Sequence, residues 1–209
     1  MWLLILTLCA VHVWSIERGP RWLFYATKTL PILLMAVVLI SLYEVVGQYA
    51  LWMAVGLLVS VVGDLLLMHP KDRFVQGLTV FLLVHFIYSF AFYTQLDGLI
   101  NWWLPLLLLS VGIIVFLLLL PTLGNMKLPV AFYSLGILGM AWAAIEYWRV
   151  DHAQSAAFAV MGALIFITSD IVLAVDRFRS SSAFSRHVIM ITYYTAQLLL
   201  TLSVVAYRA

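Results

Sequence analysis

The stretch LPLLLLSVGIIVFLLLL, residues 104–120, contains no charged side chain and is one continuous apolar block. A second, largely apolar block covers residues 153–167. Of the 209 residues, 66% are hydrophobic and 10% are charged, whereas a soluble domain carries about 25% charge. Apolar blocks of about 20 residues match the roughly 30 Å hydrocarbon core of a bilayer at about 1.5 Å per helical residue. The sequence therefore predicts an integral membrane protein.

In lipid, every backbone amide needs a partner within the protein, so only helices or closed-barrel strands can cross the membrane. Barrel strands alternate polar and apolar residues, and these blocks do not, so we predict an all-α membrane protein. Residues 1–16 lack the basic leader and cleavage site of a signal peptide and are expected to form a retained first helix. Polar breaks divide the sequence into a bundle of eight expected transmembrane helices, at residues 2–16, 25–43, 49–68, 74–95, 101–121, 127–148, 153–175 and 186–207. No connection could hold a soluble domain, so residues 1–209 are expected to form a single transmembrane domain.

Basic residues are distributed unevenly between the two ends of this expected bundle. Nine lie in or beside the connections after the first, third, fifth and seventh spans, and two lie at the opposite end. Because cytoplasmic loops carry the excess of Lys and Arg, both termini are expected outside the cytoplasm. The nine are Arg18, Arg21, Lys28, Lys71, Arg73, Lys127, Arg177, Arg179 and Arg186, and the two are Arg149 and Arg208.

Two short segments, half the sequence apart, resemble each other. Gly63–Asp64 leads into Asp72–Arg73–Phe74, and Ser169–Asp170 leads into Asp176–Arg177–Phe178. This spacing fits two parallel repeats of four helices each. Chance similarity between leucine-rich spans would produce the same pattern, so both interpretations stay open.

The two aspartates are costly residues. An ionised Asp at the centre of a membrane helix costs roughly 2.5–3.5 kcal/mol on insertion scales. Asp64 and Asp170 lie at similar depth, near the cytoplasmic ends of the third and seventh spans. Snorkelling or a structural bond between helices could explain one such residue. Two at matched depth, each after a small residue, favour a polar cavity that opens towards the cytoplasmic leaflet.

Other polar residues fall at neighbouring depths. His85 shares one helix face with Gly77, Phe81 and Tyr88, and it is either a hydrogen-bonded core residue or a functional one. Lys28 is either an interfacial anchor or a partner for a carboxylate or a substrate phosphate. The last span adds the polar residues Tyr193, Tyr194, Gln197 and Thr201, and Tyr133 lies near the cytoplasmic end of the sixth.

Paired carboxylates are a general tool for the acid-catalysed hydrolysis of acetal-like ethers. One, kept protonated by an apolar setting, donates a proton, and the other activates water or stabilises a cation. Neither the G-x-S-x-G motif of serine lipases nor the H-E-x-x-H motif of zinc enzymes occurs. The G-x-G-D motif of intramembrane aspartyl proteases is incomplete, because Val61 replaces its first glycine. The single Cys9 excludes an intrachain disulfide, and the lack of a basic stripe argues against nucleic-acid binding.

An ordered set of residues carries a resemblance to a known family. The set is Lys28, Pro31, Gly63, Asp64, Phe74, Gly77, Phe81, His85, Tyr88, Gly162, Ala163, Phe166, Ser169, Asp170, Ala174, Phe178, Tyr194 and Gln197. Together with the length and the eight expected spans, it resembles the YhhN family of lysoplasmalogenase-like membrane proteins. The resemblance covers nearly the whole sequence, and no single motif carries it.

The resemblance implies hydrolysis of the vinyl ether of lysoplasmalogens to a fatty aldehyde and glycerophosphocholine or glycerophosphoethanolamine. Protonation of the enol ether gives an oxocarbenium ion, to which water adds, so the reaction needs a proton donor and a nearby anion. The implied catalytic residues are Asp64 and Asp170, in either order of acid and base, with His85. The implied substrate-binding residues are Lys28, Tyr133, Ser169, Tyr194 and Gln197, and neither a cofactor nor a metal is expected.

Two alternatives stay open. The same carboxylates could carry protons in a transporter or a lipid-binding protein, or the fold could hydrolyse another lipid bond. The expected partners are a lysophospholipid substrate and membrane lipid, and the sequence leaves the oligomeric state unknown. A bacterial inner membrane is the expected location, with the eukaryotic endoplasmic reticulum as the alternative.

Overall fold

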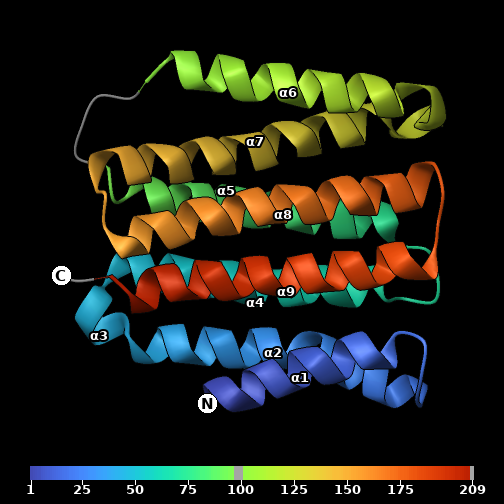
Figure 1. Cartoon of the computed structure of the whole chain (residues 1–209), viewed down its shortest axis with the longest axis horizontal. Coiled ribbons are helices and arrows are strands. Elements are labelled where there is room, and N and C mark those ends of the chain that lie inside the picture. Colours follow the sequence, from blue (N-terminus) through green and yellow to red (C-terminus); the bar gives the residue numbers. More distant parts are fainter. Residues whose placement is uncertain (97–100, 208–209) are drawn as a thin grey trace.

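The computed structural model describes residues 1–96 and 101–207. Over these residues the secondary structure is entirely helical, as expected (Figure 1). The helices are α1 Trp2–Ser15, α2 Arg21–Ser41, α3 Tyr43–Val46, α4 Gln48–Leu67, α5 Phe74–Tyr93, α6 Trp103–Leu119, α7 Lys127–Val150, α8 Gln154–Phe178 and α9 Ala183–Val205. Two short 3₁₀ turns, η1 Leu120–Thr122 and η2 Gly124–Met126, connect α6 to α7. The basic residue Arg208 lies outside the described residues.

Seven of the eight expected spans are helices long and apolar enough to cross a membrane. The exception is α1, which has 14 residues and is therefore only about 21 Å long at 1.5 Å per residue. That length falls short of a bilayer core of roughly 30 Å. In Figure 1 the N-terminus lies part-way along the bundle, and α1 runs from there to the end that holds the α4–α5 and α8–α9 connections.

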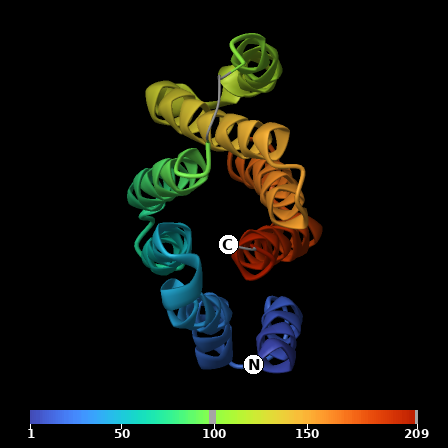
Figure 2. The same ribbon diagram turned by 90° about the vertical axis from the view of Figure 1, so that its left-hand side faces the viewer.

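Seen along the helix axes, the helices form two adjacent columns (Figure 2). One column contains α2, α4 and α5, and the other contains α1, α9 and α8. Helix α7 packs against both α5 and α8, and α6 lies on the outer side of α7. Segments far apart in the sequence, such as α4 and α9, therefore face each other across the interior.

Close packing between α4 and α5 depends on a glycine. A Cβ atom at Gly56 would lie 2.2 Å from the ring of Tyr88 on α5. Small residues allow membrane helices to approach closely, because dispersion contacts replace the hydrophobic effect inside lipid. The glycine thus makes room for a buried tyrosine whose hydroxyl belongs to the polar interior.

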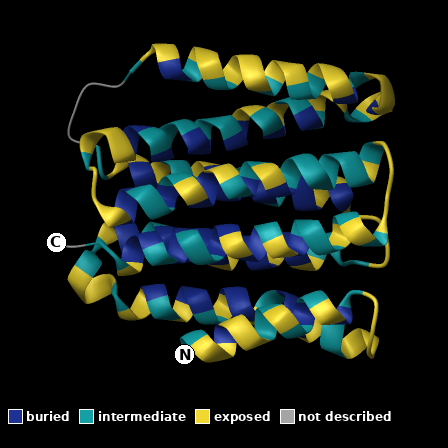
Figure 3. Cartoon of the chain, viewed as in Figure 1, coloured by how far each residue is buried: buried dark blue, intermediate teal, exposed yellow. Residues whose placement is uncertain are grey.

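The burial pattern is inverted relative to a soluble protein. Large apolar side chains such as Leu106, Ile114 and Leu118 of α6 are exposed (Figure 3). Polar side chains, including Ser60, are buried among the helices. Outward apolar surface and inward polar groups are what a multi-pass membrane protein needs, because polar groups inside lipid are satisfied only by the protein.

The two similar sequence segments meet at one end of the bundle. Arg177 donates a hydrogen bond to the carboxylate of Asp72, and its guanidinium lies 4.7 Å from the centre of the Phe74 ring. Phe74 also contacts Phe178 edge to face, with 5.8 Å between ring centres. The Arg177 guanidinium holds the pKa of Asp72 below its ordinary value. These contacts tie the start of α5 to the end of α8.

Candidate active site

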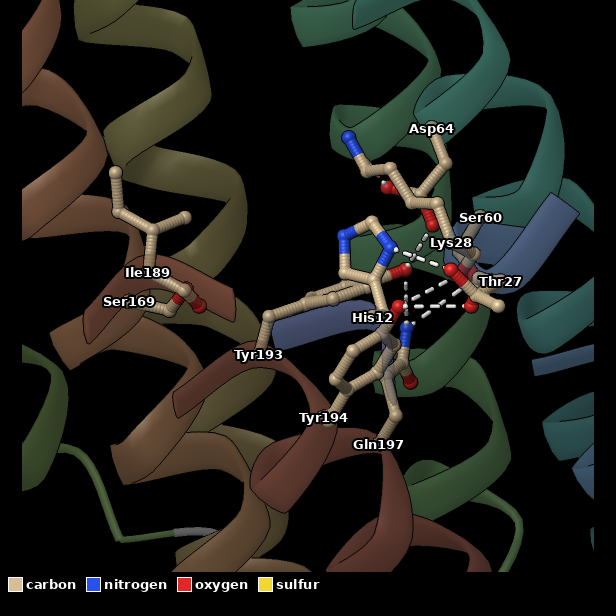
Figure 4. Close-up of polar contacts among 10 residues, drawn as sticks. All are labelled: His12, Thr27, Lys28, Ser60, Asp64, Ser169, Ile189, Tyr193, Tyr194 and Gln197. Carbon is tan, nitrogen blue, oxygen red and sulfur yellow. Dashed lines mark hydrogen bonds and ion pairs between the residues drawn. The ribbon is translucent and has the colours of Figure 1, made fainter. Parts of the chain in front are cut away.

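Asp64, on α4, is buried between two donors from other helices. The Lys28 Nζ of α2 lies 3.5 Å from one carboxylate oxygen. The hydroxyl of Tyr193, on α9, donates a hydrogen bond of 2.8 Å to the other (Figure 4). A buried carboxylate is tolerated when a cation and hydrogen bonds compensate its lost hydration. Helices α2, α4 and α9 therefore surround the Asp64 carboxyl group with one amine and one hydroxyl donor.

A chain of hydrogen bonds extends from this carboxylate into the bundle. Tyr88 donates to the Gln197 side-chain oxygen at 2.8 Å, and Gln197 donates to the Tyr193 hydroxyl at 3.2 Å. Gln197 also donates to the hydroxyl of Ser60 at 3.2 Å. The donors point in one direction, from Tyr88 through Gln197 and Tyr193 to Asp64. Such chains polarise one another and strengthen the last bond to the anion.

Asp170, on α8, has different neighbours. The Tyr133 hydroxyl, from α7, donates a hydrogen bond of 2.5 Å to its carboxyl group. The His85 Nε2, from α5, lies 3.8 Å from the same oxygen, which is too long for a hydrogen bond. No Lys or Arg pairs with Asp170 among the described residues. Both ring nitrogens of His85 are buried and lack a hydrogen-bond partner within that same part of the protein.

One cavity of about 300 Å³ reaches both aspartates. Its lining includes Asp64 and Asp170 together with the aromatic rings of Phe81, Phe166 and Tyr193. The Phe166 ring centre lies 5.7 Å from that of Tyr193 and 5.1 Å from that of His85. Ligand sites are commonly apolar cavities of roughly 300–1,000 Å³ with a few convergent polar groups. This cavity has the size and the mixed lining of a small-ligand site, with Asp64 and Asp170 among its lining residues.

The structure brings together most of the predicted site residues. The cavity lining includes Lys28, Asp64, Ser169 and Asp170, while His85 and Tyr133 lie beside Asp170 and Gln197 supports Tyr193. The hydroxyl of Ser169, however, donates to the backbone carbonyl of Ile189 at 3.1 Å (Figure 4). That bond joins α8 to α9.

Tyr194 is buried like Tyr193, but its hydroxyl bonds to the backbone of α2 and not to an aspartate. Its hydroxyl donates to the backbone carbonyl of Lys28 at 3.0 Å, with the carbonyl of Thr27 at 3.3 Å. The residue that reaches Asp64 is its neighbour Tyr193, for which the sequence pattern predicted no role. Successive helical residues are turned by about 100°, so the two adjacent tyrosines reach different partners although both are buried. The periodicity of Tyr193 with Gln197, four residues later, was the available signal.

His12, on α1, is a second residue that sequence reasoning did not single out. It is fully buried, and its Nδ1 lies 3.1 Å from the Thr27 hydroxyl. That hydroxyl donates to the carbonyl of Leu23, so His12 Nδ1 acts as the donor. The ring also lies edge to face on Tyr194, with 5.6 Å between ring centres. His12 therefore joins the short helix α1 to α2 and α9 (Figure 4).

No group of three or more His, Cys, Asp or Glu side chains that could hold a metal ion is found within residues 1–96 and 101–207. The polar side chains that line the cavity are instead three aspartates, one lysine, two arginines, one serine and one tyrosine. All of these can donate, accept or orient protons.

The fold and the site define a helical multi-pass membrane protein with a cavity that reaches two aspartates, Asp64 and Asp170. The YhhN family profile matches residues 23–204, and the protein belongs to this family. Lysoplasmalogenase TMEM86B of Rattus norvegicus is 38% identical over 200 residues, which cover 93% of this chain and 79% of the relative. Lysoplasmalogenase TMEM86A of Bos taurus is 31% identical over 94% of this chain and 84% of its own length.

A bacterial relative, the uncharacterized membrane protein YhhN of Escherichia coli O157:H7, is 29% identical over 79% of this chain and 81% of its own length. No solved structure matches the protein. The family resemblance of the sequence is thus confirmed.

Proposed function

We propose that this protein is a lysoplasmalogenase, which hydrolyses the vinyl ether of a lysoplasmalogen to a fatty aldehyde and a glycerophospholipid head group. The observation that carries the proposal is that Asp64 and Asp170 line one cavity but have different partners. Relatives named lysoplasmalogenase share 31–38% of their residues with it over most of the chain. Paired carboxyl groups in contrasting environments are the arrangement that acid–base hydrolysis of an ether requires.

We assign Asp170 as the general acid. Each aspartate accepts a hydrogen bond from a tyrosine, but among the described residues only Asp64 has a Lys or Arg partner and Asp170 has none. A carboxyl group in that setting retains its proton until a substrate accepts it. In the first step the proton moves from Asp170 to the β-carbon of the enol ether. The C=C electron pair forms the new C–H bond, and the α-carbon becomes an oxocarbenium ion.

We assign Asp64 as the anion of the reaction. The Lys28 ammonium and the Tyr193 hydroxyl both favour its ionised form. The carboxylate stabilises the oxocarbenium ion and accepts a proton from the attacking water, which gives a hemiacetal. Collapse of the hemiacetal breaks the bond to the glycerol oxygen and releases aldehyde and alcohol. In the collapse, the proton of the hemiacetal hydroxyl ends on the departing glycerol oxygen. A proton then passes from Asp64 back to Asp170 by way of solvent, which restores the starting state.

We further propose that α1, α2, α4 and α5 form one repeat and that α6, α7, α8 and α9 form a parallel second one. Helix α4 packs on α5 as α8 packs on α9, and α5 contacts α7 as α9 contacts α2. In this arrangement α1 is the counterpart of α6 and completes eight membrane segments, with both termini outside the cytoplasm. The cavity then opens towards the cytoplasmic leaflet of a bacterial inner membrane or of the endoplasmic reticulum.

The reaction is tested by giving the purified protein a lysoplasmalogen in deuterated water. Because the first step places a solvent-derived proton on carbon, the aldehyde should carry one deuterium next to its carbonyl. Release of a fatty acid would indicate hydrolysis of another lipid bond. Binding of the lipid without turnover would contradict the proposed enzyme.

The two aspartates are tested by isosteric replacement. Asp64→Asn and Asp170→Asn should each lower kcat at least about 100-fold, since general acid–base catalysis contributes roughly 10²–10⁴-fold. Asp151→Asn, at the opposite end of the bundle, is the control and should keep full activity. Thermal unfolding checks that all three variants are folded. Activity within a few-fold of wild type in either cavity variant removes that residue from the mechanism.

The assignment of acid and anion has its own test. A lysophospholipid analogue with an ammonium group at the position of the oxocarbenium carbon should bind wild type and Asp170→Asn equally well. Asp64→Asn should bind it at least about tenfold more weakly, because the ionised partner is lost. The reverse pattern of affinities would exchange the two roles.

A further inference from the structure

The cavity that contains the aspartates opens among basic side chains at the end of the bundle where α8 and α9 are connected. Three cations line it, namely Lys28, Arg177 and Arg186. Lys28 pairs with Asp64, and Arg177 pairs with Asp72. Arg186 takes part in none of the four ion pairs found within the described ranges. It is therefore the lining cation that has no protein counter-charge in that part of the chain.

The carboxylate nearest to Arg186 in the sequence has other partners. Asp176, which also lines the cavity, accepts hydrogen bonds from the Ser182 backbone at 3.1 Å and from the Ser185 hydroxyl. Ser182 in turn caps the first turn of α9. Asp176 thus orders the α8–α9 connection and leaves the Arg186 guanidinium exposed at the cavity mouth.

Arg186 and Tyr193 lie seven residues apart on α9, which places them on the same helix face. Their separation along the helix axis is about 10 Å at 1.5 Å per residue. Tyr193 marks the depth of Asp64, to which its hydroxyl is bonded. In a lysophospholipid, six bonds separate the phosphorus from the vinyl α-carbon, which becomes the oxocarbenium centre opposite Asp64, and an extended chain advances roughly 1.2 Å per bond, or about 7 Å in all. The two spacings match within the reach of an arginine side chain.

We propose that Arg186 binds the phosphate diester of the lysophospholipid head group at the cavity mouth. The guanidinium fork matches two phosphate oxygens. This inference rests on the proposed function and deepens it, because it makes the enzyme selective for phosphorylated over neutral vinyl-ether lipids. It also changes the expected role of Lys28, whose ammonium is held by Asp64 and is not available to the phosphate.

The test measures binding and turnover separately in the full-length protein. The binding probe is a 1-O-alkyl lysophosphoethanolamine, which has no vinyl ether and is not hydrolysed, and its neutral control is the 1-O-alkylglycerol with the same chain. Arg186→Gln should weaken binding of the phospholipid about tenfold, the effect of losing one partly exposed charge-assisted hydrogen bond. Binding of the alkylglycerol should stay unchanged, and Arg186→Lys should recover part of the loss.

Arg179→Gln is the matched control. Arg179 is an exposed arginine in the α8–α9 connection, close in sequence to Arg186, but it does not line the cavity. Phospholipid binding by Arg179→Gln should therefore match that of wild type. Competition by inorganic phosphate shows whether Arg186 recognises free phosphate or requires the attached lipid. Competition at concentrations close to those of the lipid contradicts a head-group site.

Several outcomes overturn the proposal. Arg186→Gln could lose affinity equally for the phospholipid and the alkylglycerol, or lose affinity for neither. Arg179→Gln could lose as much affinity for the phospholipid as Arg186→Gln does, or the wild-type protein could fail to bind the phospholipid. Failure of the proposed function is a different result. If the proposed function is wrong, the protein does not hydrolyse the lysoplasmalogen, but it still binds the phospholipid in a way that depends on Arg186.

Discussion

The contact between Lys28 and Asp64 pairs a buried carboxylate with a cation, and each partner depends on the other. Lys28→Met keeps the length of the side chain but leaves the aspartate without its cation. Removing one member of a buried ion pair costs roughly 3–5 kcal/mol, because the remaining charge is uncompensated. We expect Lys28→Met to lower the free energy of unfolding by about 3 kcal/mol in mixed micelles.

The double variant Lys28→Met/Asp64→Asn is the control for this prediction. It removes both charges, so it should unfold at a higher denaturant concentration than Lys28→Met. Equal stability of the single and double variants would show that the two side chains do not interact. Turnover should be lost in both, because the anion of the proposed mechanism is disturbed in one and absent in the other.

The adjacent tyrosines of α9 offer a matched pair of substitutions. Tyr193→Phe removes the hydroxyl that donates to Asp64, and kcat should fall about tenfold or more, in line with a lost hydrogen bond to a charged group. Tyr194→Phe removes a bond to the backbone of α2 and should cost about 1 kcal/mol of stability with kcat close to wild type. Steady-state kinetics and thermal unfolding of both variants separate these effects. A larger kcat loss in Tyr194→Phe would restore the substrate role that the sequence predicted for it.

The pairing of α4 with α5 depends on the absence of a side chain at Gly56. Gly56→Ala would place a Cβ atom 2.2 Å from the Tyr88 ring, and overpacking of this kind costs about 1–3 kcal/mol. Because Tyr88 bonds to Gln197, its displacement should also lower activity. Gly139→Ala on α7 is the control, since a Cβ there meets no atom within 4 Å. In micelles, Gly56→Ala should therefore unfold more readily than Gly139→Ala. Equal stability of the two variants would contradict the tight contact at Gly56.

The connection between α4 and α5 is joined to α8 by an exposed ion pair. Arg177 lowers the pKa of Asp72, so the pair stabilises the fold above the ordinary aspartate pKa of about 3.9. That stabilisation is lost as the pH falls through the lower pKa of the folded protein. The difference in Tm between wild type and Asp72→Asn should therefore shrink as the pH is lowered from about 6 to 3. A difference that does not change with pH would show that the carboxylate is not stabilised by Arg177.

The orientation of the bundle in the membrane can be measured with cysteine labelling, because Cys9 is the only cysteine. In a Cys9→Ser background, Ser181→Cys lies in the α8–α9 connection and His152→Cys lies in the α7–α8 connection at the other end. With the basic end in the cytoplasm, an impermeant maleimide added to bacterial spheroplasts should label only His152→Cys. Labelling of Ser181→Cys in intact spheroplasts would reverse the proposed topology.

The helical class and seven of the expected spans followed from composition and from the spacing of polar breaks. These properties are local, because a stretch of apolar residues must be about 20 long to cross a bilayer. The length of α1 was less predictable. Its apolar residues continue to Ile16, yet a helix of 14 residues is too short to cross alone. It packs against α2 and α9, and the buried contact from His12 to Thr27 is part of that packing.

The two aspartates stand out in the amino-acid sequence by itself, because an ionisable residue inside a membrane helix is costly wherever the helix lies. The residues that contact these two aspartates cannot be identified from the sequence by itself. Which helix faces α4, whether Tyr193 or Tyr194 reaches Asp64, and whether Lys28 bonds to a carboxylate or stays free all depend on how distant segments pack. Packing thus paired Lys28 with Asp64, and within the described residues it left both Asp170 without a Lys or Arg partner and Arg186 without a carboxylate partner, although both line the same cavity.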